Sequence, residues 1–117
     1  QKLGFQEESA LAYQRVIELE YPDFDVWLDY SQLLHISGYV EEAIIALYEA
    51  IEKFPEVAEL HYRLSVILLE KNKRKESIDV LARALDIDYS KHQEVFDYAP
   101  ILQNDAEILS LISSHKK

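Results

Sequence analysis

Apolar side chains recur every three or four positions along most of the chain, which is the spacing of one face of an α-helix. This pattern predicts an all-α protein, because only short stretches with glycine, proline or asparagine interrupt it. Pro100 falls inside the sixth helical pattern and should end or kink that helix near Ala99. The predicted helices span residues 5–20, 24–37, 40–53, 56–71, 74–87, 90–99 and 104–114.

The pattern coincides with itself when the sequence is shifted by about 34 residues. Gly4, Gly38 and Asn72 then align, and all three residue types tolerate the left-handed backbone of a tight turn. Small residues align with small ones and large with large, which lets two helices approach closely. Each unit should therefore be a helix, a turn, a second helix and a loop. The aligned sets include Ser9, Ala43 and Ser77; Tyr13, Leu47 and Leu81; Trp27, His61 and Val95; and Leu34, Leu68 and Leu102.

Candidate helix ends agree with this spacing. Asp23 can cap a helix that begins at about residue 24. Pro55 suits the first turn of the next helix, at about residue 56. Two further helices are expected to begin at residues with the spacing of a capping box, namely Ser90 with Gln93 and Asn104 with Glu107.

The aligned residues resemble the tetratricopeptide repeat, whose pattern combines a large aromatic, a small residue, a turn glycine, alanines and a closing proline. In the copy over residues 58–89, Tyr89 stands where proline is usual. The last copy, over residues 90–117, has a proline inside its first helix. The resemblance implies a right-handed superhelical solenoid of antiparallel helix pairs, with about three and a half repeats and seven helices. The best copy carries it with Trp27, Tyr30, Ser31, Leu34, Gly38, Ala43, Leu47, Ala50 and Pro55.

A single helical-repeat domain is expected over residues 1–117. Its parts are the second half of a repeat (1–22), two repeats (23–57 and 58–89) and a degenerate C-terminal capping repeat (90–117). The first helix has no partner before it, so self-association or upstream repeats are expected to cover its apolar face. The chain lacks an initiating Met and starts inside a repeat, so we expect it to be part of a longer protein.

The charge balance limits the classes of partner. The formal net charge is -10, and residues 1–60 hold 13 acidic residues but only three basic ones. An acidic surface repels phosphates, so we expect no nucleic-acid partner, whereas a basic protein would be attracted. No apolar run approaches the roughly 20 residues that cross a bilayer, so we expect no membrane partner. The absence of cysteine fits a reducing compartment, and we expect a cytoplasmic location.

Few residues are arranged for chemistry. The sequence has no glycine-rich phosphate loop and no nucleophile motif. Adjacent acids such as Glu41 and Glu42 diverge around a helix, so they form no acid–base pair. His61 occupies the position of Trp27 one unit earlier, which favours packing over metal ligation. The basic run 71–75 lies at a turn, either as solvated residues or as a docking patch for an acidic segment. We therefore expect that the protein is not an enzyme and binds no cofactor.

In the family that these repeats resemble, the first helix of each unit lines a concave groove that binds a peptide or a partner protein. Arg63 is the only cation near the groove here, so the basic clamp that some members use for a C-terminal carboxylate is missing. We expect instead a segment that is apolar with some basic character. By register, the expected groove residues are Asp25, Leu28, Gln32, His35, Glu59, Tyr62, Val66, Leu69 and Phe96.

The leading hypothesis is a non-catalytic scaffold for protein–protein interaction. One alternative is a regulatory or positioning appendage of a larger multidomain enzyme or regulator, which a catalytic or sensor domain upstream of Gln1 would favour. Another alternative is a self-assembling structural module, which predicts a concentration-dependent oligomer.

Overall fold

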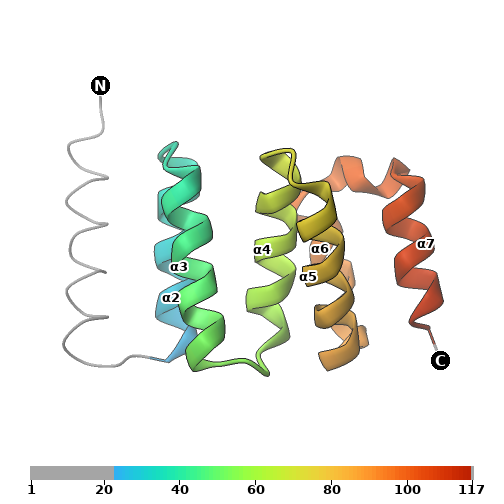
Figure 1. Cartoon of the computed structure of the whole chain (residues 1–117), viewed down its shortest axis with the longest axis horizontal. Coiled ribbons are helices and arrows are strands. Elements are labelled where there is room, and N and C mark those ends of the chain that lie inside the picture. Colours follow the sequence, from blue (N-terminus) through green and yellow to red (C-terminus); the bar gives the residue numbers. More distant parts are fainter. Residues whose placement is uncertain (1–22, 117) are drawn as a thin grey trace. The chain divides into compact units, whose positions relative to one another are not determined.

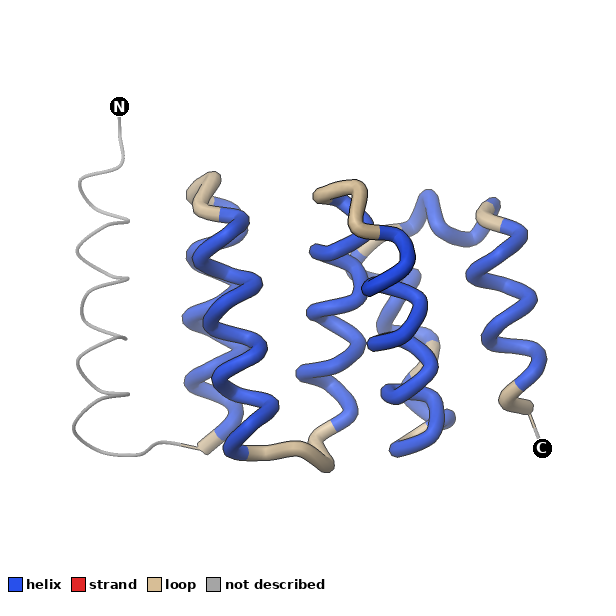
Figure 2. Tube along the Cα trace, in the orientation of Figure 1, coloured by secondary structure: helices blue, strands red, loops and turns tan. Residues whose placement is uncertain are grey.

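The computed structural model describes residues 23–116, and every regular element within that range is helical (Figure 1 and Figure 2). The predicted all-α class is therefore confirmed, whereas the predicted helix over residues 5–20 lies outside the described range. The chain divides into two compact units, unit 1 (residues 1–54) and unit 2 (residues 55–117). The elements are α2 (Phe24–Ile36), α3 (Val40–Lys53), α4 (Ala58–Glu70), α5 (Arg74–Ile87), α6 (Gln93–Tyr98) and α7 (Ala106–Ser114), with 3₁₀ helices η1 (Tyr89–Lys91) and η2 (Pro100–Asn104).

In unit 1, α2 packs against α3 and the turn at Gly38 connects them. Gly38 has φ +90°, and a Cβ there would meet no atom within 4 Å, so the backbone conformation alone favours glycine. The Tyr39 N–H donates to the carbonyl of Leu34 at 2.8 Å and closes the end of α2. At the other end of the pair, the rings of Phe24 and Phe54 meet edge to face, with centroids 6.3 Å apart. The buried residues are Trp27, Ser31 and Leu34 on α2 and Ala43, Ile44, Ala46, Leu47 and Ala50 on α3.

In unit 2, α4 and α5 form the corresponding pair. Asn72 takes the place of glycine in the turn, with φ 62°, as the repeat alignment predicts. The Lys73 N–H donates to the carbonyl of Leu68 at 2.9 Å, as Tyr39 does in unit 1. The small residue Ser77 on α5 lies directly against α4, because its hydroxyl donates to the carbonyl of Ser65 at 2.6 Å inside the core. Small residues at the predicted register thus allow close helix packing.

Two of the expected helix starts differ in detail from the structure. Asp23 is the N-cap of α2, but its side chain makes no capping hydrogen bond. Pro55 was expected in the first turn of the next helix, and this is wrong, because α4 begins at Ala58. The carbonyl of Pro55 is instead held at 3.0 Å by the Nε2 atom of the buried His61, which keeps the proline in the turn before α4.

Both predicted capping boxes are also wrong. Asp88 rather than Ser90 caps the helical segment after α5, since its carboxylate accepts the Ser90 N–H at 3.1 Å. Asp105 rather than Asn104 caps α7 and accepts the Ile108 N–H at 3.1 Å. In each case a carboxylate stands close to the expected cap. Because an ionised acceptor makes the stronger hydrogen bond, the aspartate determines where the helix begins.

The C-terminal part of unit 2 is shorter and less regular than the helix pairs before it. Pro100 ends α6 after Tyr98 and opens η2, so the predicted break at this proline is confirmed. The α7 helix then packs against α5 and is fastened at its start by Arg74. The guanidinium of Arg74 lies 2.8 Å from a carboxylate oxygen of Asp105 and 2.8 Å from one of Glu107.

Candidate functional site

The helix α2 carries the expected binding residues of unit 1 on one side. Asp25, Leu28, Gln32 and His35 follow each other at spacings of three and four residues, so they share a face of the helix. Asp25 and Gln32 are exposed, and Leu28 and His35 are partly exposed. The buried residues of α2, which are Trp27, Ser31 and Leu34, lie on another side of the helix. These four residues are therefore accessible to a partner, and their role in binding stays a prediction.

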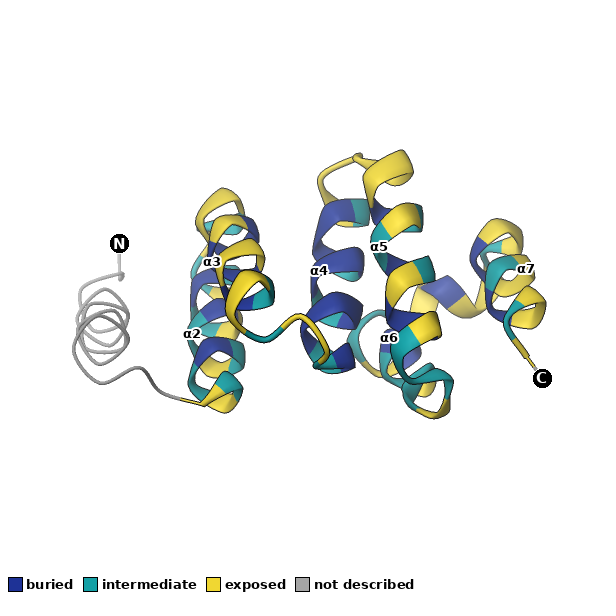
Figure 3. Cartoon of the chain, turned by 60° about the horizontal axis from the view of Figure 1, so that its bottom comes forward, coloured by how far each residue is buried: buried dark blue, intermediate teal, exposed yellow. Residues whose placement is uncertain are grey.

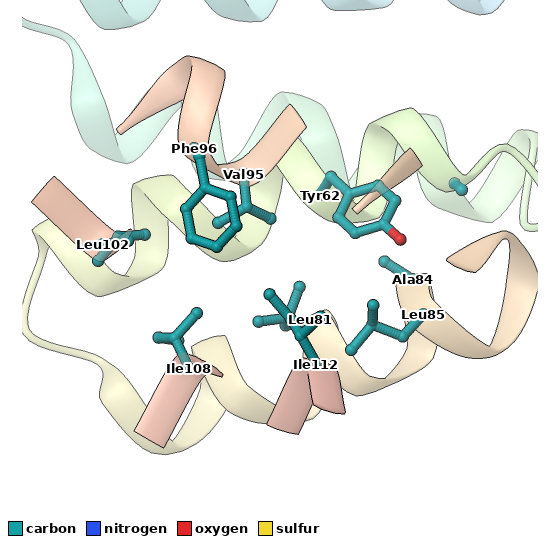
Figure 4. Packing of buried hydrophobic residues seen from close by; sticks show 10 residues of the cluster. Tyr62, Leu81, Ala84, Leu85, Val95, Phe96, Leu102, Ile108 and Ile112 are labelled. Carbon is teal, nitrogen blue, oxygen red and sulfur yellow. The ribbon is translucent and has the colours of Figure 1, made fainter. Parts of the chain in front are cut away.

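Tyr62 and Phe96 do not lie on a surface, which corrects their expected place in a groove. Tyr62 is 0% exposed and Phe96 is 9% exposed. Figure 4 shows both rings pointing into the core, together with Val95 and toward Leu81 and Ile112. The physical reason is that α6 packs against α4 and covers the side of α4 on which Tyr62 lies.

The Tyr62 side chain also makes a structural hydrogen bond. Its hydroxyl donates to the carbonyl of Asp88 at 2.8 Å, which links α4 to the end of α5. Burial raises the pKa of the Tyr62 hydroxyl far above its ordinary value, and the charges of Asp88 and Glu94 raise it further. The hydroxyl therefore stays protonated and donates at neutral pH. Tyr62 is a core residue with a buried polar anchor.

Around this core, α4 and α6 present a partly exposed surface, which we call the α4–α6 face. Val66 and Leu69 are partly buried and pack against the core cluster with one side only. Glu59, also expected in the groove, keeps 23% of its side chain exposed. The residues of the face are Glu59, Arg63, Val66 and Leu69 from α4, Lys91 from η1, and Glu94 and Tyr98 from α6.

Charged groups on the α4–α6 face form a connected polar cluster. Lys91 Nζ lies 3.3 Å from an Oε atom of Glu59 and joins η1 to α4. The hydroxyl of Tyr98 donates to Glu94 at 3.3 Å, one helical turn away on α6. The guanidinium of Arg63 stacks 4.3 Å from the centre of the Tyr98 ring, a favourable cation–π contact between α4 and α6. The face is thus organised by contacts between helices.

Two carboxylates in this cluster influence each other. Burial raises the pKa of the Glu94 carboxyl above its ordinary value, and the negative charge of Glu59 raises it further. The hydrogen bond to Glu59 raises the pKa of Lys91. Burial also raises the pKa of the Tyr98 hydroxyl, more than the Arg63 charge lowers it. Because Glu94 is partly desolvated and near a like charge, an additional cation from a partner would be stabilised here.

Sequence reasoning found only part of this face. The spacing of Glu59 to Arg63 and of Glu94 to Tyr98 is four residues, and that signal was available for each helix alone. The pairing of Lys91 with Glu59 joins segments far apart in the sequence, and no local pattern reveals it. The role of Arg63 as a stacked residue likewise depends on the packing of α6 on α4.

The part of the chain that the structure describes offers no candidate metal site. Residues 23–116 contain no group of three or more histidine or acidic side chains that could hold a metal ion. His61 is 3% exposed and bonded to the Pro55 carbonyl, so it packs, as its register predicts. Because a carbonyl can only accept, the Nε2 atom of His61 carries the proton. Within the same range, all helices are too short or too polar to cross a membrane.

The comparison with known families agrees with this geometry. Residues 58–91, which span α4, α5 and η1, match the family model described as tetratricopeptide repeat. Repeats of this family are generally modules for protein–protein interaction and are generally non-catalytic. No curated protein matches the chain.

Proposed function

We propose that this tetratricopeptide repeat protein binds a partner protein through the α4–α6 face and acts without catalysing a reaction. The observation that carries the proposal is the combination of partly exposed apolar and charged groups on one surface. Val66 and Leu69 offer apolar area, and Glu59 and Glu94 offer negative charge beside it. A partner segment with an apolar side chain next to a lysine or arginine fits this chemistry.

The burial of Tyr62 and Phe96 changes the expected energetics of binding. These two rings would have supplied most of the apolar contact area, and they already serve the core. Affinity therefore depends on the smaller side chains of the face and on charge pairing. Such an interface is expected to bind at micromolar affinity or more weakly, because ordering and association offset most of the gain from burial.

The accessible side of α2 is proposed as a separate contact surface in unit 1. Leu28 provides apolar area there, with Asp25, Gln32 and His35 as polar neighbours. A segment with the same apolar and basic character would suit this surface too. Variants of α2 should weaken binding on their own if the partner uses both surfaces.

Affinity capture with the full chain tests the proposal. Proteins retained by the unaltered chain should be lost with the double variant Glu59→Gln and Glu94→Gln, because both carboxylates of the face become neutral. The matched control is Glu56→Gln with Asp79→Asn, which also removes two charges, from exposed residues outside the α4–α6 face. Retention of the same partners by the double variant, with unchanged circular dichroism, would rule out the α4–α6 face as the binding surface. Loss of binding in the control to the same extent would show a general charge effect.

A further inference from the structure

The helix α3 exposes apolar side chains on the side that faces away from its buried residues. Ile45 is 58% exposed and Tyr48 is 39% exposed, although both are large and apolar enough to belong in a core. They lie three residues apart, so their side chains are neighbours on one face of the helix. Figure 3 shows this exposed side of α3 as a band of yellow along the helix. Two neighbouring exposed apolar residues of this size favour a contact surface.

Acidic residues surround this apolar pair. Glu41 lies one turn before Ile45, Glu49 lies one turn after it, and Glu52 lies one turn after Tyr48. All three glutamates are exposed. Across residues 23–54, the single lysine or arginine is Lys53, against seven acidic residues. We call the surface of Glu41, Ile45, Tyr48, Glu49 and Glu52 the acidic α3 face.

We propose that the acidic α3 face binds a basic amphipathic helix of a partner protein, at a surface distinct from the α4–α6 face. The apolar stripe of that helix contacts Ile45 and Tyr48. Its lysine or arginine residues pair with Glu41 and Glu52, which lie 11 positions apart, or about 16 Å along the axis of α3. A helix laid along α3 matches the straight row of contacts, and bases near the two ends of its apolar stripe match Glu41 and Glu52 at the two ends of that row.

The charge of this surface selects against other occupants. A second copy of the chain would bring its own acidic residues to the same place, and like charges across an interface oppose association. An anionic lipid surface is repelled for the same reason. A basic helix instead gains from every glutamate of the face, and its binding should weaken in high salt because these pairs are exposed.

A synthetic peptide tests the proposal. It contains about 16 residues, with leucine at every third or fourth position and lysine near both ends of that stripe and along one side of it. We expect fluorescence anisotropy with the full chain to show binding that Ile45→Ser with Tyr48→Ser, or Glu41→Gln with Glu52→Gln, weakens about tenfold. A peptide with glutamate in place of lysine should not bind.

The matched control is Glu56→Gln with Asp97→Asn, which removes two exposed charges from unit 2 and should leave the affinity within about twofold. Equal weakening by this control, or unchanged binding by both face variants, would overturn the proposal. Sedimentation equilibrium of the chain alone tests whether a second copy of the chain covers the acidic α3 face. A dimer that the Ile45→Ser and Tyr48→Ser changes dissociate would show that a second copy covers this face, and would also overturn it.

Discussion

Replacing Tyr62 tests whether its side chain stabilises the core or binds a partner. The side chain is 0% exposed, lies in one cluster with Leu81, Leu85 and Val95, and donates a hydrogen bond to the Asp88 carbonyl. Removal of a large buried aromatic ring to alanine costs about 3–5 kcal/mol, because contacts are lost and a cavity remains. For a chain of this length, that loss corresponds to a melting temperature lower by about 10–25 °C.

A second substitution isolates the hydrogen bond of Tyr62. Tyr62→Phe keeps the ring and removes only the hydroxyl. The Asp88 carbonyl also accepts the Lys91 N–H at 3.3 Å, so it keeps one partner. The expected cost is therefore about 1 kcal/mol, the usual net value of one such bond. The alanine variant should be several-fold more destabilised than the phenylalanine variant.

The assay is thermal unfolding of the full chain, followed by circular dichroism at 222 nm. Ile101→Ala is the matched control, since Ile101 is 77% exposed and its truncation should change stability by no more than about 0.5 kcal/mol. A Tyr62→Ala variant that melts like the unaltered chain would refute the placement of this ring in the core. If that variant also lost partner binding, the original expectation of a ligand-facing Tyr62 would be restored.

Substitutions at three further positions test the local structure. Burial lowers the pKa of His61 below 6.5, and the hydrogen bond to the Pro55 carbonyl only partly opposes this lowering. The unfolded chain therefore binds a proton at His61 more readily than the folded chain as the pH falls below 6.5. Urea unfolding should show stability falling from pH 7 to pH 5.5, and less steeply in His61→Gln; equal slopes would contradict this. Asp105→Ala removes both the cap of α7 and the partner of Arg74, and should cost at least about 1 kcal/mol, whereas Asp105→Asn keeps the cap and should cost less in the same unfolding assay. Asn72 has φ 62°, so Asn72→Ala should destabilise by about 1 kcal/mol and Asn72→Gly should not; similar melting temperatures for the two variants would argue against this backbone conformation.

Local signals in the sequence identified the regular helices well. The structure places α3 at residues 40–53 and α5 at residues 74–87, as their apolar spacing predicts. Gly38 and Asn72 both have positive φ, as the repeat alignment predicts. These features depend on neighbours within a few residues, so periodicity and turn chemistry are sufficient to find them.

The errors about the binding site arise where distant segments meet. Tyr62 occupies the same repeat position as Leu28, yet Leu28 is partly exposed and Tyr62 is fully buried. The repeat alignment predicts where a residue lies on its own helix, but it does not predict which neighbouring helix packs over that residue. In unit 2 that neighbouring helix is α6. The contact between Lys91 and Glu59 escaped prediction for the same reason.

Binding at the α4–α6 face is tested most directly by nuclear magnetic resonance. A captured partner would be titrated into the isotope-labelled full chain while amide shifts are followed. We predict the largest shift changes around Glu59, Arg63 and Val66 and from Lys91 to Tyr98, with little change in α5. Shift changes confined to α5 and α7, or none at saturating partner, would contradict the proposed binding surface.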